Sequence, residues 1–103
     1  MVIFSVLYPA TEGARFDQAY YDATHVPLVR EAFAATGLVD VRVFRGVGNG
    51  TGGPAPYVLM AHLSFDSPAS LQASLTGPRG GEVFADVARF TDIRPVTQVS
   101  VPG

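Results

Sequence analysis

The sequence predicts an α+β fold of ferredoxin-like βαββαβ order, a four-stranded antiparallel sheet with helices on one face. Three observations carry this prediction. Hydrophobic residues alternate with a period of two in residues 38–47 and 57–65, residues 2–8 are rich in β-forming side chains, and apolar residues recur every three or four positions in two helical segments. The segments follow one another as strand, helix, strand, strand, helix, strand, which is the split β-α-β order. The length of 103 residues suits one domain spanning residues 1–103.

The first strand and the first helix are separated by a change of hydrophobic period. Residues 2–8 are rich in β-branched and aromatic side chains and end at a turn cluster that begins with Pro9. Residues 16–36 carry the helical period. Because Pro27 has no amide hydrogen and disfavours helical geometry in the residue before it, we expect a kink or break there. Gly37 is expected to end the second piece as its C-terminal cap.

The second and third strands are expected over residues 38–47 and 57–65, on either side of a Gly- and Pro-rich loop. Each has one fully apolar face, which we expect to lie beneath the helices. These faces consist of Val39, Val41 and Val43 in one strand and Tyr57, Leu59, Ala61, Leu63 and Phe65 in the other.

The second helical region begins at Ser67-Pro68, where serine can cap the helix and proline fits the first turn. Gly77-Pro78 interrupts it, and residues 82–90 are expected to form a second helical stretch with Val83, Phe84 and Val87 inward. The last strand is expected over residues 93–101. Pro95 in that strand indicates an edge position or a bulge.

The sheet face away from the helices is also partly apolar. Alternation places Phe44, Val58, Met60 and Val96 there, among polar residues that include His62. An apolar patch of this kind is typical of an interface, and pairing two sheets face to face would cover it. At about 25 cal/mol per Å² over roughly 800 Å² per partner, such burial favours a homodimer. A monomer with one partly apolar face remains the alternative.

Composition and charge exclude several classes of protein. The net charge is −2 and all seven basic residues are scattered arginines, so no nucleic-acid interface is expected. No apolar run is long enough to cross a membrane, and residues 1–8 lack the features of a signal peptide, so a cytoplasmic protein is expected. The chain has no cysteine, and two histidines are too few to form a metal site without carboxylates.

Residues 16–28 form the segment densest in chemically active side chains. Tyr21 and His25 are four residues apart, so a continuous helix places them on one face, where they could position and protonate a substrate. Alternatively, His25 only hydrogen-bonds backbone groups freed by the proline. Asp86 could orient the His25 ring, or it could be a solvated helix charge. His62 is expected to be a structural histidine of the sheet face away from the helices.

Two groups of residues resemble the EthD family of the dimeric α/β-barrel superfamily. The first is Phe16-Asp17-X-X-Tyr20-Tyr21-X-X-X-His25-Val26-Pro27-Leu28. The second is Leu63-X-Phe65-Asp66-Ser67 followed by Asp86-X-X-X-Phe90-X-Asp92. The resemblance implies a homodimer without a cofactor, in which a small-molecule cleft lies between each sheet and its own helices. It carries over to His25 as the family histidine, with Tyr21 and Asp86 as its neighbours.

The resemblance leaves two functions open. The first is an enzyme that performs acid/base chemistry on a hydrophobic carbonyl or aromatic metabolite in catabolism or polyketide tailoring. Isomerase, cyclase, lyase and monooxygenase-like reactions all fit it. Its catalytic residues would be His25, Tyr21 and Asp86, and the cleft walls would be Phe16, Tyr20, Phe33, Phe84 and Phe90. The second is a non-catalytic binding or accessory protein for a degradative or monooxygenase system. A carboxylate or tyrosine bonded to His25 inside a cavity would favour the enzyme.

Overall fold

A computed structural model describes residues 1–103 and confirms the predicted α+β architecture. Its elements, in chain order, are β1 (Val2–Pro9), α1 (Gln18–Tyr20), η1 (Tyr21–His25), α2 (Val26–Ala34), β2 (Leu38–Arg45), β3 (Tyr57–Phe65), α3 (Pro68–Thr76), α4 (Pro78–Phe90) and β4 (Val96–Ser100).

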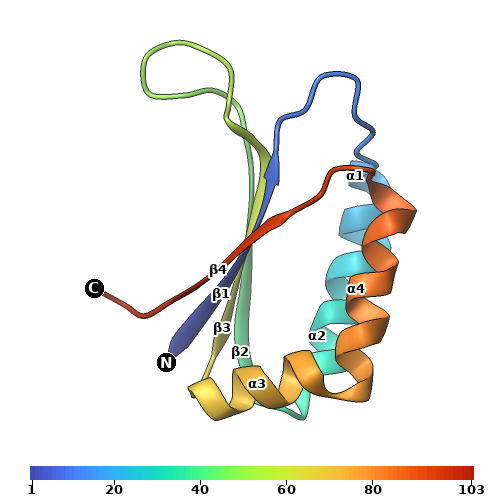
Figure 1. Cartoon of the computed structure of the whole chain (residues 1–103), viewed down its shortest axis with the longest axis vertical. Coiled ribbons are helices and arrows are strands. Elements are labelled where there is room, and N and C mark those ends of the chain that lie inside the picture. Colours follow the sequence, from blue (N-terminus) through green and yellow to red (C-terminus); the bar gives the residue numbers. More distant parts are fainter.

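The four strands form one antiparallel sheet in the order β2-β3-β1-β4, which is the ferredoxin-like order. The helices all lie on one side of the sheet, with α4 beside α2 and α3 near the end where β2 begins (Figure 1). The strand β4 lies at an edge, as Pro95 indicated, but it begins after Pro95 rather than including it.

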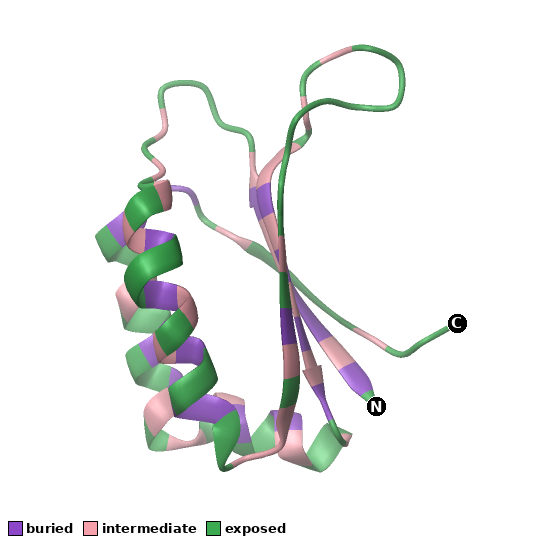
Figure 2. Ribbon diagram, turned by 180° about the vertical axis from the view of Figure 1, so that it is seen from behind, coloured by how far each residue is buried: buried purple, intermediate pink, exposed green.

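The hydrophobic core lies between the sheet and the helices, and Figure 2 shows the buried faces of the helices turned toward the sheet. Alternation in β3 is as predicted, since Leu59, Ala61, Leu63 and Phe65 are all buried. Because residues 57–65 alternate strictly, every second side chain of β3 reaches the helices.

Val39 does not lie beneath the helices, which corrects the prediction. The pairing of β2 with β3 shifts between Leu38 and Asp40, so Val39 is an extra, bulged residue. It is 57 % exposed, whereas Val41 is buried. A bulge reverses the alternation at one point, and the sequence pattern alone did not reveal it.

The first helical region is continuous through Pro27, where a kink or break was expected. Five residues, Tyr21–His25, adopt a π-helical turn in which the Val26 amide donates to the Tyr21 carbonyl. Pro27 follows this turn as the second residue of α2, so the amide hydrogen that it lacks is missing inside a continuous helical region. Gly37 has a φ of +98° and makes the turn into β2, although the helix itself is capped at Ala35.

The second helical region is longer than its hydrophobic pattern indicated. Ser67 caps α3 through its side chain, as predicted. The next helix begins at Pro78 rather than residue 82, since Gly80 and Gly81 weaken the pattern without ending the helix. A Cβ atom on Gly80 would lie 2.5 Å from the Leu75 carbonyl oxygen, so glycine allows α3 and α4 to meet closely.

Candidate functional site

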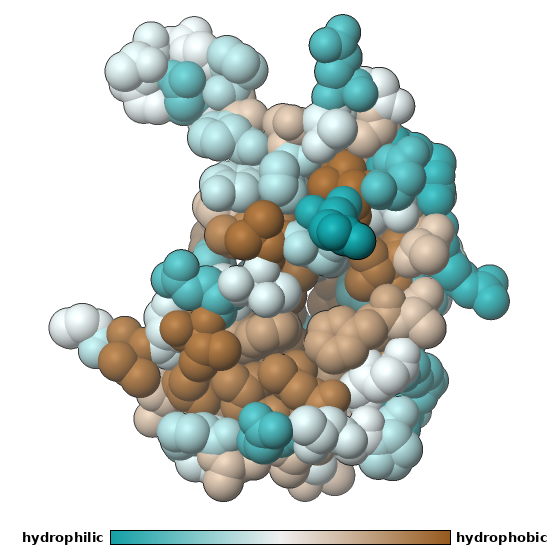
Figure 3. All heavy atoms as spheres, in the orientation of Figure 1, coloured by the Kyte–Doolittle hydropathy of each residue, from teal (hydrophilic) through white to brown (hydrophobic).

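A cavity of about 90 Å³ lies between the sheet and the helices. Figure 3 shows a hollow in this place, bordered mainly by apolar side chains. The strands β1 and β3 supply one wall, and the helices α2 and α4 supply the other. Its polar groups are few: the His25 ring and the hydroxyls of Tyr8, Tyr21 and Thr97. Such a pocket suits a mostly apolar small molecule held by a few polar contacts.

The π-helical turn places two polar side chains in this pocket. Tyr21 and His25 stand at its first and last positions, and they are 2 % and 5 % exposed. Their ring centroids are 5.3 Å apart at an interplanar angle of 30°. Because a π-helical turn contains one more residue than an α-helical one, it re-aims the side chains around it, and such turns are frequent at functional sites.

His25 is held by a carboxylate from α4. Its Nδ1 lies 2.8 Å from Oδ2 of Asp86, and the other carboxylate oxygen accepts a hydrogen bond of 2.7 Å from the Tyr20 hydroxyl. The His25 and Asp86 side chains are 6 % and 12 % exposed. Because the ionised carboxylate can only accept, Nδ1 carries the proton and Nε2 is left with its lone pair. Asp86 thus fixes both the orientation and the tautomer of His25.

The pKa values of the pair favour a neutral imidazole beside an ionised carboxylate. Burial lowers the pKa of His25 below its ordinary value, and the hydrogen bond and charge of Asp86 offset this only in part. Burial raises the pKa of Asp86, but hydrogen bonds from Tyr20 and His25 and the nearby positive charges lower it by more. His25 is therefore suited to accept a proton at Nε2 near neutral pH.

Three of the predicted wall residues lie outside the pocket lining, which corrects that part of the expectation. Phe90 is fully buried behind His25, with ring centroids 4.6 Å apart. Phe16 packs against Phe90 at 5.3 Å. Tyr20 points to Asp86 instead of the cavity. The rings of Phe16 and Phe90 instead pack against Tyr8 of β1, at 5.4 and 5.8 Å, and so lie behind the residues that line the pocket.

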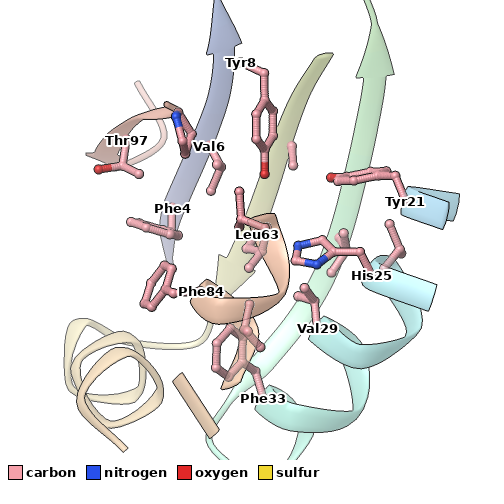
Figure 4. A pocket seen from close by; sticks show the side chains of 16 residues that line it. Phe4, Val6, Tyr8, Tyr21, His25, Val29, Phe33, Leu63, Phe84 and Thr97 are labelled. Carbon is pink, nitrogen blue, oxygen red and sulfur yellow. The ribbon is translucent and has the colours of Figure 1, made fainter. Parts of the chain in front are cut away.

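The other two predicted wall residues line the pocket. Phe33 is 1 % exposed and contributes from α2. Phe84 contributes from α4 but is 46 % exposed, so it was wrongly expected to lie fully inward. Figure 4 shows both rings at the same end of the pocket, away from the Tyr8 and Tyr21 hydroxyls.

Tyr8 is a pocket residue that the sequence reasoning missed. It is 1 % exposed, at the end of β1, and its side chain lies on the helix-covered face of the sheet. Burial and the neighbouring Tyr21 raise the pKa of Tyr8, so its hydroxyl stays protonated at neutral pH. Strand alternation would have placed it beside Val6 and Phe4 on the inner face, and that was the available signal.

The second histidine lies on the opposite face of the sheet. Its Nδ1 is 2.7 Å from the Ser5 hydroxyl, and its ring is 5.8 Å from that of Phe44. His62 therefore does not contact His25. No group of three His, Asp or Glu side chains comes close enough to share a metal ion. Nor does any helix have the length and apolar character needed to span a bilayer.

The chain is similar to proteins of one family over most of its length. The family model of the EthD domain matches residues 11–94. A solved EthD-like protein from Ralstonia eutropha is 36 % identical, with a TM-score of 0.86, and the match covers 96 % of this chain and 88 % of that one. An EthD-family protein from Bacillus halodurans is 27 % identical, with a TM-score of 0.80 and coverage of 100 % and 99 %.

A more distant likeness extends to the fold alone. A dimeric ferredoxin-like protein of unknown function from Thermobifida fusca is 13 % identical, with a TM-score of 0.56, and the match covers 98 % of this chain and 90 % of that one. No curated protein matches the chain significantly.

Proposed function

The chain belongs to the EthD family, and on that premise we propose that it is an enzyme that performs cofactor-free acid/base chemistry on a small hydrophobic molecule. Its substrate is a hydrophobic carbonyl or aromatic metabolite that occupies the pocket between the sheet and the helices. His25 accepts or donates the proton, Asp86 orients it, and Tyr21 contacts the substrate.

One observation carries this proposal: the His25–Asp86 hydrogen bond of 2.8 Å at the wall of an almost entirely apolar cavity. A histidine that served only to satisfy backbone groups would bond to carbonyl oxygens. This one instead bonds to a carboxylate, and its other nitrogen has no protein partner. A buried histidine with a lowered pKa, bonded to a carboxylate at the wall of a cavity, is typical of a catalytic group.

The same observation favours the enzyme over the accessory binding protein. Both need the apolar pocket, but only the enzyme needs a base held in one tautomer. Orientation by Asp86, itself bonded to Tyr20, is therefore support for the enzyme.

The test is turnover by proton NMR of a panel of hydrophobic ketones, lactones and phenols incubated with the protein. We expect at least one compound to be converted by the wild type and by His62→Gln, which alters the histidine on the opposite face. We expect His25→Gln to lose the conversion. Turnover that survives in His25→Gln contradicts the proposed role, and binding without any turnover favours the accessory protein.

We further propose that the protein is a homodimer whose sheets pack through the faces away from the helices. On that face Phe44 is 50 % exposed and Val96 is 49 % exposed, and the bulge adds Val39. The Thermobifida fusca protein of the same fold is described as dimeric. Light scattering after gel filtration should give twice the chain mass of 10.9 kDa. A monomer at micromolar concentration contradicts the proposal.

A further inference from the structure

Two buried tyrosine hydroxyls in the pocket have no hydrogen-bond partner in the protein. Tyr8 and Tyr21 are 1 % and 2 % exposed, and both line the cavity. No side-chain nitrogen or oxygen in the chain is both fully enclosed and unpaired. These two hydroxyls, which the protein leaves unpaired, must therefore touch the space of the pocket itself. A hydroxyl that reaches the pocket and has no protein partner can pair with a ligand there, so a pocket with two of them is suited to a ligand that accepts both hydrogen bonds.

The two hydroxyls come from different layers and converge on the pocket. Tyr8 reaches in from β1 and Tyr21 from the π-helical turn, and Figure 4 shows both hydroxyl groups directed into the pocket that the His25 ring also lines. The ring centroids of the two tyrosines are 6.3 Å apart, at 81° to one another. Both rings also pack edge-on against Phe90, at 5.8 Å and 5.0 Å, which fixes their positions.

The chemistry of these groups defines what they can bind. Burial raises the pKa of both phenols, so both stay protonated and can donate at neutral pH. His25 Nε2, with its lone pair, can only accept. The complement of two donors and one acceptor is a ligand with an acceptor oxygen next to an acidic hydrogen. No arginine lines the pocket and the chain has no lysine, so nothing there balances a carboxylate on the ligand.

We propose that Tyr8 and Tyr21 form a paired donor site for one carbonyl oxygen, and that the substrate is an uncharged, mostly apolar, enolisable carbonyl compound. This inference rests on the proposed function, because it assigns His25 Nε2 as the base. Tyr8 becomes a substrate-contacting residue of the same standing as Tyr21.

The step that these groups support is an enolisation. The α-carbon–hydrogen bond of the substrate breaks and its proton forms a bond to His25 Nε2. The electron pair of that bond forms the carbon–carbon double bond, and the carbonyl π pair moves to the oxygen. That oxygen gains negative charge and accepts both phenol hydrogen bonds more strongly than the ground state did. The imidazolium, stabilised by Asp86, returns the proton to the same carbon or to a conjugated one. No oxidant or reductant is consumed.

The first test measures binding with three probes that share a benzene ring. They are acetophenone, which has a carbonyl, ethylbenzene, which has no oxygen, and benzoate, which is charged. We expect the wild type to bind acetophenone more tightly than ethylbenzene and benzoate most weakly, as followed by NMR titration. Tyr8→Phe and Tyr21→Phe should each weaken acetophenone binding by about 3- to 10-fold, the worth of one hydrogen bond, and leave ethylbenzene binding unchanged.

The second test measures the reaction. Loss of the acetophenone methyl signal in D₂O reports enolisation, and the protein should accelerate it. Each Tyr→Phe change should slow this exchange on the order of 100-fold, more than it weakens binding, because the donors act most strongly on the developing oxyanion. Tyr57→Phe is the matched control, since Tyr57 does not line the pocket. Thermal melts establish that each variant folds.

The outcomes separate this inference from the proposed function. If acetophenone binds no more tightly than ethylbenzene, or if Tyr8→Phe changes neither binding nor exchange, the paired donor site is wrong. Should His25→Gln still accelerate the exchange while Tyr8→Phe weakens acetophenone binding, the donor site stands and the assigned base is wrong.

Discussion

Phe90 should matter more to the stability of this protein than any other residue of α4, and Phe84 on the same helix provides the comparison. Phe90 is fully buried, and its ring contacts His25, Tyr21 and Phe16 at centroid distances of 4.6, 5.0 and 5.3 Å. Phe84 is 46 % exposed. The same Phe→Ala change therefore removes a packed core side chain at one position and a half-exposed one at the other.

The expected costs differ several-fold. Phe90→Ala should lower the free energy of unfolding by about 3–5 kcal/mol, the usual cost of deleting a buried aromatic side chain. Phe84→Ala should cost about 1 kcal/mol, because only half of its apolar surface leaves water on folding. The total free energy of unfolding of a domain of this size is roughly 5–15 kcal/mol, so Phe90→Ala removes a large share of the stability.

Urea denaturation followed by circular dichroism measures both values. In case Phe90→Ala does not fold, Phe90→Leu keeps most of the volume and should cost about 1–2 kcal/mol. The reasoning fails if Phe90→Ala is as stable as Phe84→Ala. It would then follow that the aromatic cluster behind His25 is not tightly packed, and that the Asp86 hydrogen bond alone orients the imidazole.

Three further predictions concern the pH dependence, Tyr20 and the sheet face away from the helices. His25 has a folded-state pKa below its ordinary value of 6.5, so the unfolded chain takes up a proton first, and stability should fall as the pH drops below about 6.5. Urea midpoints between about pH 7.5 and 5 should show this slope in the wild type and lose it in His25→Gln. Tyr20→Phe removes a hydrogen bond that lowers the pKa of Asp86. This change should slow acetophenone exchange by about 2- to 10-fold and move the acid limb of the pH–rate profile to higher pH. A profile identical to that of the wild type would show that Tyr20 does not help Asp86 to position His25. Phe44→Glu should give a monomer by light scattering, while Val47→Glu, in a fully exposed position, should leave the dimer intact; equal masses for the two variants would place the interface elsewhere.

The sequence predicted the layers and the order of the elements because alternation and helical period depend only on local geometry. The strict alternation of β3 and the Ser67 cap of α3 are of this kind. The bulge at Val39 and the π-helical turn before Pro27 were not predicted. Each inserts one residue into a regular element, and a periodic pattern over eight to ten residues carries too little information to reveal a single insertion.

The candidate site, like the fold, was predicted from the sequence only in part. The resemblance implied that Asp86 is a neighbour of His25, and of the two alternatives left open for Asp86 the structure shows the hydrogen bond to His25. The side chains around the pair were assigned by residue type, and that is where the errors lie. Aromatic residues at helix ends were all expected to line the cleft, yet Phe16 and Phe90 pack against other rings. Tyr8 was overlooked because it belongs to a strand outside the motif. Which rings face a cavity depends on contacts between segments far apart in the chain, and no single segment encodes them.

One strand connects the two surfaces that the proposals concern. In β1, Phe4, Val6 and Tyr8 face the pocket, while Ser5, between them, faces the other side and bonds to His62. The proposed dimer interface lies on that other side of the sheet, away from the residues that line the pocket. Dimerisation would instead restrain β1 from its far side, and with it the position of the Tyr8 hydroxyl. The dimer proposal and the donor-site proposal are therefore linked, because both concern how firmly β1 is held in place. A monomeric variant should still bind acetophenone. The ratio of its affinity for acetophenone to its affinity for ethylbenzene should be smaller than in the dimer.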